Sequence, residues 1–191
     1  LRDRPLRSNP NYNPTAIVGT DPEEHWEQFT TAIRMEPRTA EDFQARAVSR
    51  AKRRVLDLAA ADYSKAIELK PDLADAYCGR ASVLNATGDL PGAIRDASQT
   101  IVLNPNHVEA YMARAVAYTR LGNFAAALRD NDQTIQLSPT NALAHQNRAV
   151  TYYLMKNFDA AWKDVERCRG LGGTPTDSFV RALSEASGRN P

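Results

Sequence analysis

The sequence predicts an all-α superhelix of antiparallel helix hairpins, because the same chemistry recurs four times along the chain at one interval. Four prolines are equally spaced, at Pro37, Pro71, Pro105 and Pro139. Each proline is followed at fixed distances by an arginine, two alanines and an aspartate. A fixed period of this length indicates a repeat array, in which each unit contacts only its neighbours and the core is continuous between them.

Two segments precede the repeats. Residues 1–20 carry three prolines among asparagine and serine without helical periodicity, so we expect an extended N-terminal tail. Residues 21–36 begin with an aspartate suited to cap a helix and a proline suited to its first turn. Apolar residues then follow at helical spacing, which predicts an N-terminal half-repeat helix: Trp26, Phe29 and Ile33.

Residues 37–175 divide into four helical hairpins. In the second hairpin, Gly88 and Asp89 separate two apolar stripes of helical period, which marks the turn between two helices. The first hairpin has Arg53 and Arg54 at this place, so we expect a less regular corner there. A short helix at 176–188 is expected to cap the open end of the array. The hairpins are expected at about 40–70, 74–104, 108–138 and 142–173.

With these features in view, the chain resembles the tetratricopeptide-repeat family over about residues 21–173. The period, the hairpin unit, the closing prolines and small residues such as Ala81 and Ala93 carry the resemblance. Aromatic residues early in the first helix add to it, at Phe43, Tyr77 and Tyr111, although His145 departs from the pattern. These matches all concern packing. They imply a right-handed superhelix whose concave groove holds peptide segments or partner proteins.

Each repeat contains one recurrent pair of oppositely charged residues. An arginine on the first helix of the hairpin is followed sixteen residues later by an aspartate on the second helix. Antiparallel helices joined by a short turn bring such residues together and allow a two-pronged ion pair. We expect structural pairs that fix the register of each hairpin; a ladder of charges offered to a ligand is the alternative. The pairs are Arg46 with Asp62, Arg80 with Asp96, Arg114 with Asp130, and Arg148 with Asp164.

The resemblance also implies that residues of the first helices line the groove. An acidic row at one edge, made by Glu41, Asp75 and Glu109, is either a solvated face or a site for a basic, extended peptide. The N-terminal tail itself contains several arginines, so it is expected either in its own or a neighbour's groove, or on the outer surface. The expected groove residues are Glu41, Gln44, Val48, Asp75, Cys78, Ser82, Asn85, Glu109, Met112, Val116, Thr119, Gln146, Asn147, Val150 and Tyr153.

One subclass of the family grips the C-terminal carboxylate of chaperones with lysine, asparagine and arginine on this face. The positions that would hold its lysines carry other residues here, and of the clamp residues only Asn147 matches. We therefore do not expect capture of a chaperone tail. The residues that replace the lysines are Gln44, Cys78, Met112 and Gln146, and Glu41, Asp75 and Glu109.

Composition argues against several other functions. The 24 lysines and arginines nearly balance 23 aspartates and glutamates, so no basic field would attract nucleic acid. Apolar runs of a few residues predict no membrane span. The three histidines fall in different units, and no phosphate loop or nucleophile elbow is present, so we expect no enzyme, no metal and no cofactor. The two cysteines, in different hairpins, are expected to be free thiols.

These observations predict a non-catalytic protein–protein interaction scaffold that binds a peptide segment or partner protein in its concave groove. A self-associating structural assembly element and an accessory interaction domain of a larger enzyme are the alternatives. The chain begins at Leu1 without an initiator methionine, from which we expect a processed product or an excised piece.

Overall fold

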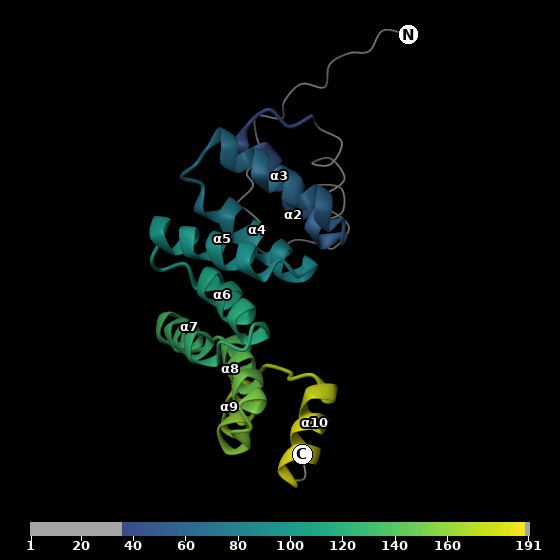
Figure 1. Ribbon diagram of the computed structural model, residues 1–191, viewed down its shortest axis with the longest axis vertical. Coiled ribbons are helices and arrows are strands. Elements are labelled where there is room, and N and C mark those ends of the chain that lie inside the picture. The colour runs from purple at the N-terminus through teal and green to yellow at the C-terminus, as the bar shows by residue number, and fades with distance from the viewer. Residues whose placement is uncertain (1–35, 190–191) are drawn as a thin grey trace.

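The computed structural model describes residues 36–189 of the chain as a stack of helices (Figure 1). These residues contain no strand, so the predicted all-α fold class is confirmed. The expected tail at 1–20 and all but the last residue of the expected helix at 21–36 lie outside the described residues. In chain order the helices are α2 (Ala40–Lys52), α3 (Leu56–Leu69), α4 (Ala74–Thr87), α5 (Leu90–Leu103), α6 (Val108–Arg120), α7 (Phe124–Leu137), α8 (Ala142–Leu154), α9 (Phe158–Gly170) and α10 (Asp177–Ser187).

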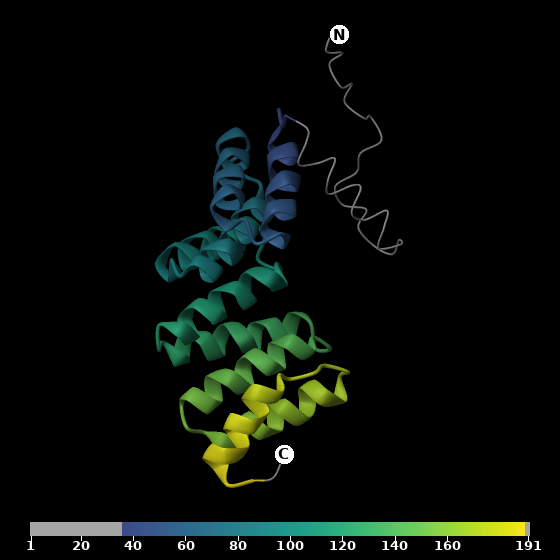
Figure 2. The ribbon, with the colours of Figure 1, turned by 90° about the vertical axis from the view of Figure 1, so that its right-hand side faces the viewer.

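Consecutive helices pair into hairpins, and the hairpins follow one another along the long axis of the molecule (Figures 1 and 2). The pairs are α2 with α3, α4 with α5, α6 with α7, and α8 with α9. Each second helix also packs against the first helix of the next hairpin, and α9 packs against α10 in the same sense. Every described unit therefore shares its core with the units beside it, as in repeat arrays generally.

The two rows of helices differ in how closely their members approach. Successive first helices contact one another, α2 with α4, α4 with α6 and α6 with α8, whereas no comparable contact joins the second helices among the described residues. A stack whose helices touch along one row and separate along the other must curve towards the touching row. The first helices consequently line the inner face of the array, and the second helices form its outer face.

The corners inside the hairpins share one backbone conformation. Left-handed φ angles recur once in each hairpin, at Arg54 (63°), Gly88 (95°), Gly122 (76°) and Lys156 (61°). The expected irregular corner in the first hairpin is therefore wrong, because Arg54 adopts the conformation that glycine supplies in the second and third hairpins. The helix that follows each of the last three corners is capped by a side chain that accepts a backbone N–H bond: Asp89, Asn123 and Asn157.

The repeated alanines lie where the two helices of a hairpin cross. All eight, at the two recurrent positions, are at most 1% exposed. Helices that approach this closely leave no room for a branched side chain. At the C-terminal end, α10 buries Val180 and Leu183 against Trp162 and Val165 of α9, while its opposite side is polar. The indole Nε1 of Trp162 also donates to Ser187 Oγ at 3.0 Å.

Asn131 of α7 is a polar residue in an apolar position. It is fully buried, and neither polar atom of its amide makes a hydrogen bond with a described residue. The equivalent positions of the other hairpins hold Tyr63, Ala97 and Val165, all buried. A buried amide without partners opposes folding by the free energy of its lost hydration.

Asn131→Val should therefore raise the free energy of unfolding by about 1 to 3 kcal/mol, measured by thermal or urea denaturation. The control is Asn85→Val, because the amide of Asn85 donates to the Ala113 carbonyl at 2.8 Å and its loss should destabilise the array. A lower midpoint for Asn131→Val would contradict the prediction and indicate that a bound water satisfies this amide.

Candidate functional site

Each recurrent arginine forms a two-pronged ion pair with the aspartate of the same hairpin. In all four pairs Nε and Nη2 donate to the two carboxylate oxygens, at 2.6–2.9 Å. The aspartate side chains are 4–10% exposed and the arginines 18–23%. The hydrogen bonds to the carboxylates raise the pKa of every one of these arginines, so the guanidinium groups remain charged.

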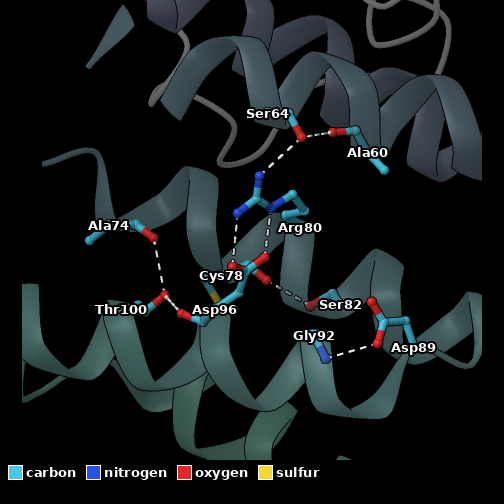
Figure 3. Close-up of polar contacts among 10 residues, drawn as sticks. All are labelled: Ala60, Ser64, Ala74, Cys78, Arg80, Ser82, Asp89, Gly92, Asp96 and Thr100. Atoms are coloured by element: carbon cyan, nitrogen blue, oxygen red, sulfur yellow. Dashed lines mark hydrogen bonds and ion pairs between the residues drawn. The ribbon is translucent and has the colours of Figure 1, made fainter. Parts of the chain in front are cut away.

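Three of these arginines also reach the preceding hairpin. Nη1 of Arg80 donates to Ser64 Oγ at 3.0 Å, as Figure 3 shows, and Ser64 lies on α3. Arg114 makes the same contact with Ser98 at 3.0 Å, and Arg148 reaches Asp132 at 2.6 Å. One side chain therefore links its own hairpin to the one before it. These acceptors were not predicted from the sequence. Ser64, Ser98 and Asp132 recur at the same interval as the prolines, and this spacing could have identified them.

Aromatic rings of the first helices pack against the arginines of the ion pairs. Arg46, Arg80 and Arg114 lie over the rings of Phe43, Tyr77 and Tyr111, with guanidinium carbons 5.5–5.8 Å from the ring centroids. In the fourth hairpin His145 replaces the aromatic ring, and its Nδ1 lies 3.0 Å from Asp164 Oδ1. With most of their donors directed at other side chains of the chain, the arginines have little left for a ligand. This geometry favours the structural interpretation of the pairs.

The acidic row at the edge of the inner face is partly paired within the protein. Lys70 Nζ donates to Glu41 Oε1 at 2.9 Å, and this hydrogen bond lowers the pKa of Glu41. His107 lies between the other two carboxylates: its Nε2 is 3.0 Å from Asp75 Oδ1, and its Nδ1 is 3.3 Å from Glu109 Oε2 without the orientation of a hydrogen bond. The side chains of Asp75 and Glu109 nevertheless remain 64% and 73% exposed.

Two residues expected to line the groove are instead buried between helices. Cys78 and Asn85 are only 7% and 8% exposed, because α4 and α6 approach closely at these positions. Asn85 binds α6 through its side chain and its backbone. The side-chain amide donates to the backbone carbonyl of Ala113, and the backbone carbonyl of Asn85 accepts from the guanidinium group of Arg120. Burial raises the pKa of the Cys78 thiol to about 12. These two side chains hold first helices together and offer little surface to a peptide.

Thr119 and Met112 also bridge first helices. Thr119 Oγ1 lies 2.9 Å from Thr151 Oγ1, which joins α6 to α8. The sulfur of Met112 lies 3.4 Å from Asn141 Nδ2, at the start of α8. Both residues keep part of their surface accessible to solvent.

Outside the acidic row, the predicted groove residues that keep exposed surface carry no charge. These side chains are half-buried, apart from Ser82, which is exposed: Gln44, Val48, Ser82, Met112, Val116, Thr119, Gln146, Asn147, Val150 and Tyr153. Tyr153 gives part of its ring to contacts with Phe158 and Phe179, with centroid separations of 6.1 and 5.7 Å. Leu143 of α8, not predicted from the sequence, is 50% exposed and stands one period after Glu109. The acidic row is thus continued by an apolar side chain.

Metal-ligand clusters and membrane-spanning helices are both absent from the part of the chain that the structure describes. No group of three or more histidine, cysteine, aspartate and glutamate side chains within residues 36–189 is arranged to hold a metal ion. None of the described helices combines the length and the apolar character that crossing a membrane demands.

Comparison with known proteins agrees with the hairpin geometry. A tetratricopeptide-repeat family model matches residues 78–142, from α4 into α8. This part of the chain, residues 78–142, belongs to the tetratricopeptide-repeat family. Among curated protein sequences, none matches it.

Solved tetratricopeptide-repeat structures share the fold at low sequence identity. A thermophilic repeat protein of Thermus thermophilus has a TM-score of 0.67 at 19% identity, covering 83% of this chain and 87% of its own. MamA has a TM-score of 0.66 at 18% identity, covering 81% and 96%. The first repeat domain of Spaghetti (RPAP3), bound to an HSP90 peptide, has a TM-score of 0.60 at 21% identity, covering 65% and 98%.

Asp130→Ala should lower the free energy of unfolding by about 3 to 5 kcal/mol, because it leaves the largely buried Arg114 without its carboxylate. The control is Glu68→Ala, which breaks an ion pair with Lys65 whose side chains are 50% and 63% exposed and should cost less than about 1 kcal/mol. Urea denaturation of both variants checks this. Equal midpoints for Asp130→Ala and the unsubstituted protein would refute the structural role of the pair.

Both thiols should react slowly with Ellman's reagent at pH 8 in the folded protein and rapidly in urea, because burial raises the pKa of Cys78 and Cys168. The folded-state pKa of Cys78, about 12, lies above its ordinary value of 9.0. Its contribution to stability is therefore complete below pH 9 and is lost as the pH rises towards 12. Rapid labelling of the folded protein at pH 8 would contradict the buried positions.

Proposed function

We propose that this tetratricopeptide-repeat protein is a non-catalytic interaction scaffold that binds an extended peptide segment of a partner protein on the inner face of α4, α6 and α8. Repeats of this family generally mediate protein–protein interactions. The observation that carries the proposal is the band of uncharged, half-exposed side chains in the middle of this face, beside ion pairs that are closed within the array.

The composition of the face favours an apolar peptide. Met112, Val116 and Val150 can pack against apolar side chains, while the amides of Gln146 and Asn147 can bond to a peptide backbone. Asp75 and Glu109 keep exposed carboxylates at the edge, and these would repel an acidic ligand. An acidic tail is therefore disfavoured, both by this repulsion and by the absence of the clamp lysines.

A basic residue in the peptide would be stabilised beside the acidic row. Lys70 already neutralises part of that row, and His107 occupies one carboxylate through its contact with Asp75, so the preference for a basic residue adds to apolar packing and does not replace it. Arginines of another protein are one source of such a residue. The arginines of residues 1–20 of this chain, outside the described residues, are another: Arg2, Arg4 and Arg7.

Self-association is the second candidate function. It is favoured by three large apolar side chains that are 43–51% exposed near the corners of the third and fourth hairpins: Leu121, Leu154 and Met155. Light scattering over a concentration series distinguishes the two candidates. A monomer at every concentration would eliminate the self-assembly function.

The test of the peptide site is selection of a phage-displayed peptide library on the immobilised, full-length protein. Peptides rich in apolar residues and poor in acidic residues should be enriched. Val116→Asp with Val150→Asp should weaken their binding at least tenfold in fluorescence anisotropy, because a peptide would then bury its apolar side chains against carboxylates.

The matched control is Val102→Asp, a substitution at a 73% exposed valine of the second helix α5. This variant should bind the selected peptides as the unsubstituted protein does. Far-UV circular dichroism must first show that both variants are folded. Loss of binding in Val102→Asp, or unchanged binding in the inner-face variant, would place the site elsewhere and overturn the proposal.

A further inference from the structure

We infer that the corner of the first hairpin, residues 50–58, is a docking site for the surface of an anionic membrane. The corner joins the end of α2 to the start of α3 (Figure 1). It combines four cations with two exposed, large aliphatic side chains and a single acidic residue, Asp57. The cations are Arg50, Lys52, Arg53 and Arg54, and the aliphatic side chains are Val55 and Leu58.

The two aliphatic side chains depart from the equivalent positions of the other hairpins. Val55 is 41% exposed and Leu58 is 50% exposed. In the place of Val55 the later corners carry a residue whose side chain caps the second helix, whereas α3 has no side-chain cap. In the place of Leu58 they carry a small residue: Gly92, Ala126 and Ala160. The first corner therefore lacks a helix cap and exposes apolar surface, and neither change stabilises the hairpin.

The exposed arginines depart from the repeat in the same way. In the second hairpin, Thr87 and Gly88 stand where the first hairpin has Arg53 and Arg54. Arg54 has a φ of 63°, in the left-handed region that glycine adopts without strain. Both arginine side chains are exposed, so packing does not account for them. Residues that depart from the local requirements of a fold are expected at functional sites.

Arg50 fixes the corner to α3 and adds to its positive charge. Its Nη1 donates to the Leu58 carbonyl at 3.4 Å and to Asp62 Oδ2 at 2.6 Å. Asp62 also accepts two hydrogen bonds from Arg46, so two guanidinium groups share one carboxylate. In the other hairpins an apolar or aromatic residue holds the place of Arg50: Leu84, Tyr118 and Tyr152. A net positive charge therefore remains here, within a chain whose total charge is close to zero.

The shape and chemistry of the corner favour a membrane over a peptide. Peptides bind in grooves or along the edges of sheets, whereas a corner at which the chain reverses is convex. A membrane surface requires no groove, because aliphatic side chains can enter its interface while adjacent cations lie beside anionic head groups. Exposed aliphatic side chains do not suit nucleic acid, whose contacts are mostly to phosphate and sugar. Val55 and Leu58, flanked by Arg53 and Arg54, supply both parts of this interaction.

The inference does not rest on the peptide site, because the corner lies outside α4, α6 and α8. Val116→Asp with Val150→Asp should therefore bind anionic vesicles as the unsubstituted protein does. A peptide site that failed its own test would leave the membrane site open to the measurements below.

Co-sedimentation of the full-length protein with vesicles tests the inference. The protein should sediment with phosphatidylcholine vesicles that contain phosphatidylserine, and not with phosphatidylcholine alone. Arg53→Thr with Arg54→Gly, which installs the residues of the second corner, should reduce this binding by roughly tenfold or more. The matched control is Lys156→Gly, which removes a cation at the same left-handed position of the fourth corner and should bind as the unsubstituted protein does. Failure to sediment with anionic vesicles, or equal losses in the variant and the control, would overturn the inference.

A second measurement reports whether the aliphatic side chains enter the membrane. Leu58→Cys and Val102→Cys each place one thiol at an exposed position for an environment-sensitive fluorophore, while Cys78 and Cys168 are buried. Anionic vesicles should shift the emission of the label at position 58 to the blue and leave the label at position 102, on α5, unchanged. Equal responses would contradict the inference. Binding of polyglutamate without binding of anionic vesicles would also overturn it, and would assign the corner to an acidic protein segment.

Discussion

The stack of hairpins depends on an arginine that recurs once in each unit. Its planar guanidinium group has five N–H donors in a fixed arrangement, and lysine could not supply the same contacts. Two donors hold the aspartate on the other helix of the hairpin, and in three units a third reaches the second helix of the preceding hairpin. The same group therefore determines the register within a hairpin and the position of that hairpin on its neighbour. Because the pairs are largely buried, the loss of either partner leaves behind a charge that water solvates poorly.

Along the first helices, the inner face changes from acidic residues near the helix starts to uncharged residues further on. Acidic residues lie near the starts of α2, α4 and α6, where the helix dipole favours them. The dipole is thus a sufficient structural reason for the acidic row, and the ion pair with Lys70 reduces the charge of the row further. In the proposed peptide site, discrimination between ligands would therefore fall to the uncharged side chains, of which Met112, Val116 and Val150 are accessible.

The ends of a repeat array are its weakest point, since a terminal unit exposes the surface that others bury. At the C-terminal end the chain solves this problem with α10, whose Val180 and Leu183 occupy the place of a next first helix while its outer side is polar. This single helix completes at the C-terminal end an interface that the inner units complete with hairpins.

The period of the repeat determined, by itself, which residues are equivalent. From that equivalence the all-α class, the hairpins and the partners of the four recurrent arginines could all be stated in advance, because short antiparallel connections leave little freedom within a unit. Only the tertiary structure decided how closely successive first helices approach and how they rotate. That approach buries Cys78 and Asn85, pairs the acidic row with Lys70 and His107, and exposes Leu143. A period specifies the phase of a residue, whereas its exposure depends on the side chains that each individual pair of helices brings together.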